Sequence, residues 1–220
     1  PMMSSVAFSN YHGIAVVDSE NPKVATSNYE IPHRFTLNIT YVKAFFEGYE
    51  TQFSLFGQAN QTNPYTYSFN KNSDGFGYND NSRQLLYVPL ENDPLVIYAE
   101  GVQSQLDAFI EAEGLSRGRI MDRNELDGSW WTKFDFRIEQ QLPGFMVGHK
   151  TSAYLVVENL GNLLNDDWGV LKQGDYLQGA VTTSITDDGR YSFDSFDNPS
   201  SQSRLTDTSL WEIRLGVKYD

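Results

Sequence analysis

The segment 209–220 alternates between two kinds of side chain. One set is almost wholly apolar or aromatic and the other is mostly charged: Ser209, Trp211, Ile213, Leu215, Val217 and Tyr219 alternate with Leu210, Glu212, Arg214, Gly216, Lys218 and Asp220. Successive side chains of a β-strand point to opposite faces of its sheet. The segment therefore predicts a strand with one apolar face and one charged face.

The same alternation recurs along the chain, in the segments 31–41, 49–56, 130–139 and 151–158, with a further strand end at 5–9. These segments approach the length of about 9–11 residues that a tilted strand needs to cross a bilayer. The pattern predicts an all-β fold in which about six spanning strands form part of a large antiparallel transmembrane β-barrel. An open sheet in lipid would leave backbone groups unpaired, so we expect residues 1–220 to pair with further strands of a longer polypeptide.

The connections between the expected strands differ in length. Short connections lie near Gly48 and at Pro143–Gly144, whereas the segments 58–129 and 159–208 are long and polar. Short turns on one side and long extracellular loops on the other are typical of outer-membrane barrels. Within the long segments we expect a short strand at 84–89, a helix at 103–114 that stops at Gly114, and a hairpin that joins 176–185 to 191–196.

Composition narrows the classes of function. No run of about 18 apolar residues exists, so no transmembrane helix is expected. A mean hydropathy of -0.47 does not exclude a barrel, because the two faces of each strand average out. The 29 acidic residues outnumber the 16 basic ones, which disfavours nucleic acid as a partner. Cysteine is absent, the three histidines are scattered and no catalytic motif is present, so we expect no enzyme activity.

One polar segment has the spacing of the first half of a calcium loop. Asn70, Asn72 and Asp74 precede Gly75, and Asp80 offers a further oxygen. Calcium takes six to eight oxygen ligands, and a glycine at this place permits a sharp turn. The position of the closing bidentate glutamate holds Asn81, so a plain turn rich in Asn and Gly is the alternative to a calcium site, and no other cofactor is expected.

The polar faces of the expected strands carry many charges: Arg34, Lys133, Asp135, Arg137, Glu139, Glu158, Glu212, Arg214 and Lys218. They could line a path for a substrate or contact a plug inside a barrel. The simpler interpretation is that water solvates them and that cross-strand pairs of opposite sign offset one another.

Several segments together resemble the C-terminal barrel of Oar-like TonB-dependent outer-membrane receptors. They occur in the family's order and span nearly the whole chain: 25–35 (ATSNYEIPHRF), 61–67 (QTNPYTY), 86–89 (LYVP), 157–169 (VENLGNLLNDDWG) and 210–219 (LWEIRLGVKY). The Asn-Leu pair at 159–160 lies where related receptors carry such a pair after their penultimate strand. Such barrels usually end on an aromatic residue, whereas Asp220 follows Tyr219 here, so we expect a terminal aromatic beyond it.

The resemblance implies a barrel of about 22 strands with an N-terminal plug, to which this chain would supply the last six strands and three extracellular loops. It implies energy-coupled passage of a bulky substrate across the outer membrane of a Gram-negative bacterium. The expected partners are the rest of the barrel and its plug, the TonB complex, outer-membrane lipid and the barrel-assembly machinery.

Two sets of aromatic side chains are candidates for roles in such a barrel. Trp130, Trp131, Trp211 and Tyr219 lie at the ends of expected strands, where an aromatic girdle meets the membrane interface. Loops carry recognition, so the candidate substrate contacts are loop aromatics, namely Tyr65, Tyr67, Phe76, Tyr78 and Trp168.

Two other classes of protein fit the alternation. A secreted soluble β-sandwich that binds carbohydrate would bury the apolar faces against a second sheet of the same chain. A surface adhesin or structural outer-membrane protein would share the barrel and differ only in what its loops hold. An apolar face left exposed as a continuous band distinguishes a barrel wall from a sandwich.

Overall fold

The computed structural model describes residues 15–17, 21, 23–71, 73–74, 84–199 and 203–219. The chain divides into two compact units. The first, here called the core unit, comprises 1–30, 63–127 and 174–202. The second, here called the sheet unit, comprises 31–62, 128–173 and 203–220. The strand expected at 5–9 lies outside the described residues.

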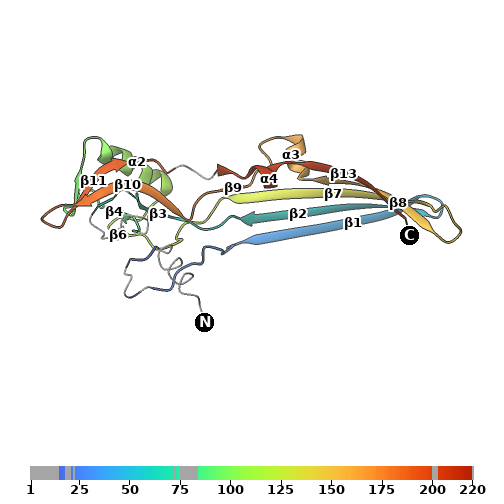
Figure 1. The fold of residues 1–220 in the computed structure, drawn as a ribbon, viewed down its shortest axis with the longest axis horizontal. Coiled ribbons are helices and arrows are strands. Elements are labelled where there is room, and N and C mark those ends of the chain that lie inside the picture. The colour runs from blue at the N-terminus through green and yellow to red at the C-terminus, as the bar shows by residue number, and fades with distance from the viewer. Residues whose placement is uncertain are drawn as a thin grey trace. The chain divides into compact units, whose positions relative to one another are not determined.

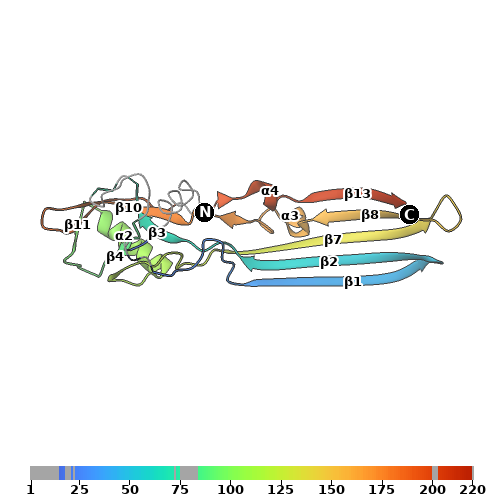
Figure 2. The same cartoon turned by 60° about the horizontal axis from the view of Figure 1, so that its bottom comes forward.

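Five long strands form the sheet unit, and every neighbouring pair is antiparallel (Figures 1 and 2). In spatial order they are β1 (Arg34–Phe46), β2 (Tyr49–Gln61), β7 (Trp130–Pro143), β8 (Lys150–Glu158) and β13 (Glu212–Tyr219). The order follows the chain, as expected for a meander in which each strand pairs with the next one. The all-β prediction is confirmed, and these strands form an open sheet in the described part of the chain rather than a closed barrel.

The register of the sheet unit places residues of like character in rows across all five strands. One row consists of Ile39, Leu55, Phe136, Val157 and Ile213, and the next consists of Tyr41, Phe53, Ile138, Leu155 and Leu215. Residues directly opposite each other in paired strands share a face of the sheet. The alternation in each strand therefore adds up to one apolar face and one polar face of the whole sheet.

Both expected short connections are present in the sheet unit. Glu47 and Gly48 join β1 to β2, and Gly48 has a φ of 81°, a conformation that glycine adopts without steric cost. The β7–β8 connection runs from Gly144 to His149. A Cβ at Gly144 would lie 2.4 Å from the backbone oxygen of His149, so this position requires glycine.

The last strand is shorter than its alternation suggests. β13 begins at Glu212, and the expected strand start at Ser209 belongs to a helical turn, α4 (Thr206–Ser209). The Ser209 hydroxyl donates a hydrogen bond to the carbonyl of Leu205 at 2.6 Å, and the Ser209 N–H donates to the same oxygen at 3.1 Å. A serine that bonds its own backbone offers an alternative to strand pairing, which is why the pattern predicted the wrong start. The remaining short elements of this unit are α3 (Leu160–Leu164), β9 (Lys172–Gln173) and β12 (Ser203–Arg204).

The core unit has its own sheet of four strands in the order β3 (Thr66–Phe69), β10 (Leu177–Ile185), β11 (Tyr191–Phe196) and β5 (Val96–Tyr98). The β10–β11 hairpin is antiparallel, as predicted, whereas β3 and β5 pair in parallel with β10 and β11. A separate ladder joins β4 (Tyr87–Val88) to β6 (Arg119–Ile120). The predicted short strand at 84–89 is thus present in reduced form.

Helix α2 (Val102–Glu113) packs its apolar face into the core unit. Val102, Leu106 and Ile110 recur every four residues and are all buried. The helix ends at Gly114, whose φ of 64° and hydrogen bond to the carbonyl of Glu111 form a left-handed cap. The predicted helix and its glycine stop are both confirmed.

A single hydrophobic core holds the core unit together: Tyr67, Phe69, Leu86, Tyr87, Val88, Val96, Val102, Leu106, Ile110, Met121, Ala180, Val181 and Phe193. It draws on both segments that the sequence predicts as long loops, 58–129 and 159–208. β2 also continues to Gln61, past the predicted start of the first loop. The two inserts are therefore largely a folded unit rather than irregular loops, because their aromatic and branched side chains bury one another.

Candidate functional site: the two faces of the sheet unit

The apolar face of the sheet unit is exposed. Its side chains come from the rows that cross all five strands. They are exposed on β1, β7 and β13, where Phe35, Leu215 and Val217 are 64%, 80% and 73% exposed, and less exposed on β2 and β8, where Val157 is buried. An isolated exposed apolar residue is normal, whereas a contiguous exposed apolar surface marks a site of interaction with protein, ligand or membrane. The further exposed members of this face are Leu37, Ile39, Tyr41, Phe134, Ile213 and Tyr219. This apolar face is one half of the candidate site, and the opposite face of the same sheet is the other.

Aromatic rings gather at the end of the apolar face where β7 begins. Trp130 stacks on Phe35, with ring centroids 6.0 Å apart, and on His33 at 6.3 Å. Trp211 is also exposed and directly precedes β13. Tryptophan, with an apolar ring and a polar N–H, is suited to a boundary between lipid and water. The predicted interface roles of Trp130 and Trp211 are consistent with these positions.

A second group of rings lies at the other end of the same face. Phe53 contacts both Tyr41 and Phe45 with centroids 6.2 Å apart. Tyr219 stacks on His149 at 5.3 Å and on Phe145 at 5.7 Å. The apolar face thus has aromatic rings at both ends and mainly aliphatic side chains between them.

The separation of the two aromatic groups can be estimated along β1. Phe35 and Phe45 are ten residue steps apart, which is about 34 Å of extended strand and about 26 Å across a layer for a strand tilted by about 40°. The apolar band of a transmembrane barrel is about 25 Å tall. The dimensions of this face match those of a lipid-facing band.

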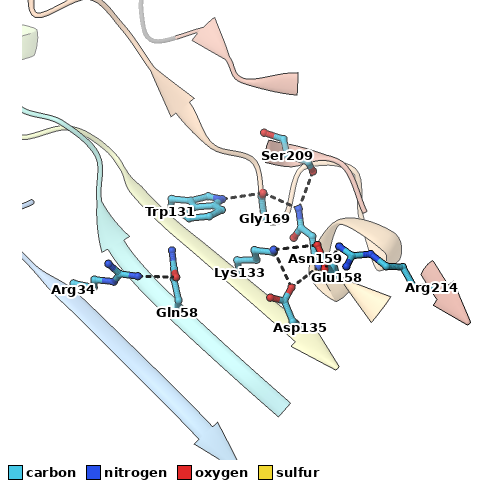
Figure 3. A network of polar contacts seen from close by, with 10 residues as sticks. All are labelled: Arg34, Gln58, Trp131, Lys133, Asp135, Glu158, Asn159, Gly169, Ser209 and Arg214. Carbon is cyan, nitrogen blue, oxygen red and sulfur yellow. Dashed lines mark hydrogen bonds and ion pairs between the residues drawn. The ribbon is translucent and has the colours of Figure 1, made fainter. Parts of the chain in front are cut away.

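The opposite face carries a network of charges (Figure 3). Lys133 lies 3.2 Å from Asp135 and 4.0 Å from Glu158, and Glu158 also pairs with Arg214. Since β7, β8 and β13 are neighbours, these contacts run across three strands. The arrangement agrees with the interpretation in which opposite charges offset one another.

Further pairs continue the polar face along β7 and β1. Arg137 contacts Glu139 at 2.5 Å, and its guanidinium lies 4.7 Å from the ring centroid of Tyr154. Arg34 donates a hydrogen bond to the side-chain oxygen of Gln58 at 3.3 Å. These groups are partly exposed, so each contact contributes little to stability, and their common effect is a neutral, hydrophilic surface.

A clamp built on Asn159 holds a short segment against the polar face. Asn159 is fully buried with a φ of 52°. Its N–H donates to Asp135 at 2.8 Å, and its side-chain amide donates to the carbonyls of Gly169 at 3.1 Å and Ser209 at 2.8 Å. A Cβ at Gly169 would lie 1.9 Å from the Asn159 side-chain oxygen, so this position requires glycine. One asparagine, directly after β8, thus ties together β7, the 159–169 segment and α4 (Figure 3).

The structure separates the two adjacent tryptophans predicted for the membrane interface. Trp131 points to the polar face, is 9% exposed and donates its ring N–H to the carbonyl of Gly169 at 3.0 Å. The assignment of Trp131 to an interface girdle was therefore wrong, because adjacent strand residues face opposite sides. Trp131 belongs instead to the clamp, as Figure 3 shows.

The predicted substrate contacts do not form one cluster. Tyr67 is 4% exposed, with its hydroxyl donating to Glu113 at 2.9 Å, so it is a core residue without an accessible ring face. Tyr65 is half-buried against it, with ring centroids 5.7 Å apart. Trp168 is exposed but belongs to the sheet unit. Phe76 and Tyr78 lie outside the described residues.

The described part of the predicted calcium loop is engaged within the core unit. The Asn70 amide donates to Asp197 at 2.8 Å and to Thr182 at 3.1 Å, and the Asp74 N–H donates to the carbonyl of Thr183. Asn72 and Asp80 lie outside the described residues. Within the described ranges, no group of three or more His, Cys, Asp or Glu residues could hold a metal ion. Asn70 is better explained as a tie between β3 and the β10–β11 hairpin.

One buried carboxylate organises a turn of the core unit. Asp93 accepts hydrogen bonds from the N–H groups of Leu90 and Leu95, both at 3.0 Å, and from the Tyr87 hydroxyl at 2.7 Å. Burial alone would raise the pKa of Asp93, but these donors outweigh burial and lower it. Burial, together with this hydrogen bond, raises the pKa of Tyr87 to about 12. No sequence pattern indicates this role of Asp93.

Among the described residues, none of the helices is both long and apolar enough to traverse a membrane. Comparisons with models of protein families, with curated proteins and with solved structures found no match.

Proposed function

We propose that this chain is part of the wall of an outer-membrane β-barrel, in the C-terminal portion of a TonB-dependent receptor. The observation that carries the proposal is the apolar face that crosses all five strands of the sheet unit and is exposed on β1, β7 and β13, with aromatic rings at both ends. Lipid is the environment in which such a face is stable, whereas in water it would associate. The opposite face, with its balanced charges, is suited to a hydrated lumen.

The placement of the connections supports the same proposal. Two short turns close one end of the sheet unit, and the residues of the core unit are inserted between strands at the other end. In outer-membrane barrels the short turns are periplasmic and the long insertions extracellular. The core unit would then be an extracellular module, and capture of a bulky substrate would be assigned to it.

A soluble β-sandwich is the less favoured alternative. Its inner face would be covered, yet Leu215 and Val217 are 80% and 73% exposed at the centre of β13. The edge strands β1 and β13 would pair with the remaining strands of the receptor. Each unpaired backbone group in lipid would otherwise cost on the order of several kcal/mol of folding free energy. The plug and the TonB complex would supply gating and energy.

The direct test is to locate the native protein with an antibody against this segment. We expect it in the outer-membrane fraction, as a species several-fold heavier than 25.0 kDa whose electrophoretic mobility changes on boiling. Dependence of substrate uptake on TonB would then separate a transporter from an adhesin. A soluble species whose mobility is unchanged by boiling would contradict the barrel and favour the sandwich.

A further inference from the structure

The β7–β8 connection carries an apolar tip. Phe145 is 91% exposed, Met146 is largely exposed and Val147 is fully exposed. Glycines flank the three residues, and no charged side chain lies within 144–148. A connection that faced only water would gain nothing from three consecutive apolar side chains, so their exposure calls for a partner.

The tip is continuous with the apolar face of the sheet unit. The Phe145 ring stacks on Tyr219, and Tyr219 lies opposite Thr151 in a row that also contains Leu142. By the strand register, the side chains of Leu142 and Tyr219 both lie on the apolar face. The turn therefore bends toward the side that carries the exposed band rather than toward the charged face.

The other short turn of the sheet unit differs at its tip. Glu47 and Gly48 form the entire connection between β1 and β2, and both are polar or small. The β1–β2 connection has two residues and the β7–β8 connection six, so the two turns differ in length as well as in the character of their tips. The difference points to a contact made by one turn and not by the other.

We propose that Phe145, Met146 and Val147 insert into the interfacial layer of the bilayer and anchor this end of the sheet in lipid. The inference rests on the proposed function, since it extends the lipid-facing band by one turn. Aromatic and aliphatic side chains next to a lipid-facing surface partition into the boundary between headgroups and acyl chains. Lipid is favoured over a protein partner because the tip is uncharged and joins the band through Tyr219.

The test uses the full-length protein reconstituted in phosphatidylcholine vesicles, with a single environment-sensitive fluorophore attached to an introduced cysteine. The native segment has no cysteine. The positions are Val147→Cys at the tip, Leu215→Cys in the band and Glu47→Cys at the polar turn. Bromine atoms on the lipids, placed near the headgroup or near the chain ends, quench fluorophores at the matching depth. A boiling-dependent mobility shift checks that each variant is folded.

We expect the Val147→Cys probe to lose most of its emission with lipids brominated near the headgroup and little with lipids brominated at the chain ends. The Leu215→Cys probe should be quenched by the deeper bromines, and the Glu47→Cys probe by neither. If Leu215→Cys is quenched and Val147→Cys is not, the tip does not enter lipid, although the barrel wall stands. Blue-shifted but unquenched Val147→Cys emission would show that protein covers the tip. If neither position is quenched, the proposed function itself fails.

Discussion

The two units of this chain use the same kinds of side chain in opposite ways. In the core unit, Phe193 and Leu86 are fully buried at the centre of a closed hydrophobic core. In the sheet unit, residues of equal hydrophobicity such as Leu215 and Phe35 stay exposed. Alternation of apolar and polar residues thus determines which side chains share a face of the sheet. It does not determine whether that face is buried, which depends on whether helices and loops of the chain pack over it.

The charges divide in the same way. The core unit has 19 acidic and 7 basic residues, a formal net charge of -12, and the sheet unit has 10 acidic and 9 basic residues, a net charge of -1. Together they give the -13 of the whole chain. The core unit thus carries a large uncompensated negative charge, whereas the charges of the sheet unit nearly cancel and several of them pair on its polar face.

The largest expected effect comes from a substitution at the centre of the buried core. Phe193→Ala should destabilise the core unit by about 3–5 kcal/mol, because it leaves a cavity in a close-packed interior. Hydrogen exchange of β10 and β11 amides in the full protein measures the loss. The matched change Leu215→Ala, on the exposed face, should leave these amides unaffected. Equal effects of the two variants would erase the distinction between the units.

A charge in the band should affect the sheet unit strongly. Ile39→Arg places a cation in the central row and should cost about 2–4 kcal/mol of folding free energy in a bilayer. The neighbouring change Thr40→Arg points to the polar face and should cost little. Denaturant titration of folding into lipid vesicles compares the two. A tolerated Ile39→Arg would indicate that the apolar face does not contact lipid.

The clamp on the polar face should have an intermediate effect. Asn159→Ala removes two side-chain hydrogen bonds and places alanine at a positive φ, so we expect a loss of about 2 kcal/mol. The loss should appear as faster proteolysis within 159–169, with β1 and β2 unchanged. The control Asn165→Ala lies in the same segment, where its side-chain oxygen accepts one hydrogen bond from the exposed Asp167 N–H.

The smallest expected effect is a pH-dependent change in the stability of the core unit. The pKa of Asp93 is lowered in the folded state, so its stabilising contribution is present above the ordinary aspartate pKa and is lost as pH falls through the folded-state value. Asp93→Asn should cost about 1 kcal/mol at neutral pH, and this difference should shrink below about pH 4. Thermal melts from acid to neutral pH follow the trend, with Glu91→Gln as the exposed control. A difference independent of pH would mean that the Asp93 charge is not what stabilises the turn.

Much of the fold could be predicted from the sequence because the signals are local. Strand alternation located β1, β2, β7 and β8 to within a few residues, and Gly114 marked the end of α2. The parallel pairing of β3 with β10 joins segments more than a hundred residues apart, and no local pattern encodes it. The sequence could thus identify the elements of the core unit but not their assembly into one core.

The candidate site was predictable in part for the same reason. Alternation predicted the two faces and the exposed Trp130, and it also places Trp131 on the polar face, because adjacent strand residues face opposite sides. It could not show that Trp131 binds the carbonyl of Gly169. The role of Asn159 depends on Gly169 and Ser209, which are brought together only by folding. The sequence around Asn159 does not indicate these hydrogen bonds, because the partner residues lie ten and fifty positions further along the chain.

The open edges of the sheet unit determine how these strands behave when they are isolated. β1 and β13 each have one side whose backbone donors and acceptors lack a strand partner in the described part of the chain. Such edges are templates for further strands, and the adjacent apolar face favours stacking of sheets. In water, copies of the segment alone would join edge to edge into insoluble assemblies. Inclusion bodies on expression of these strands alone would therefore reflect unsatisfied strand pairing.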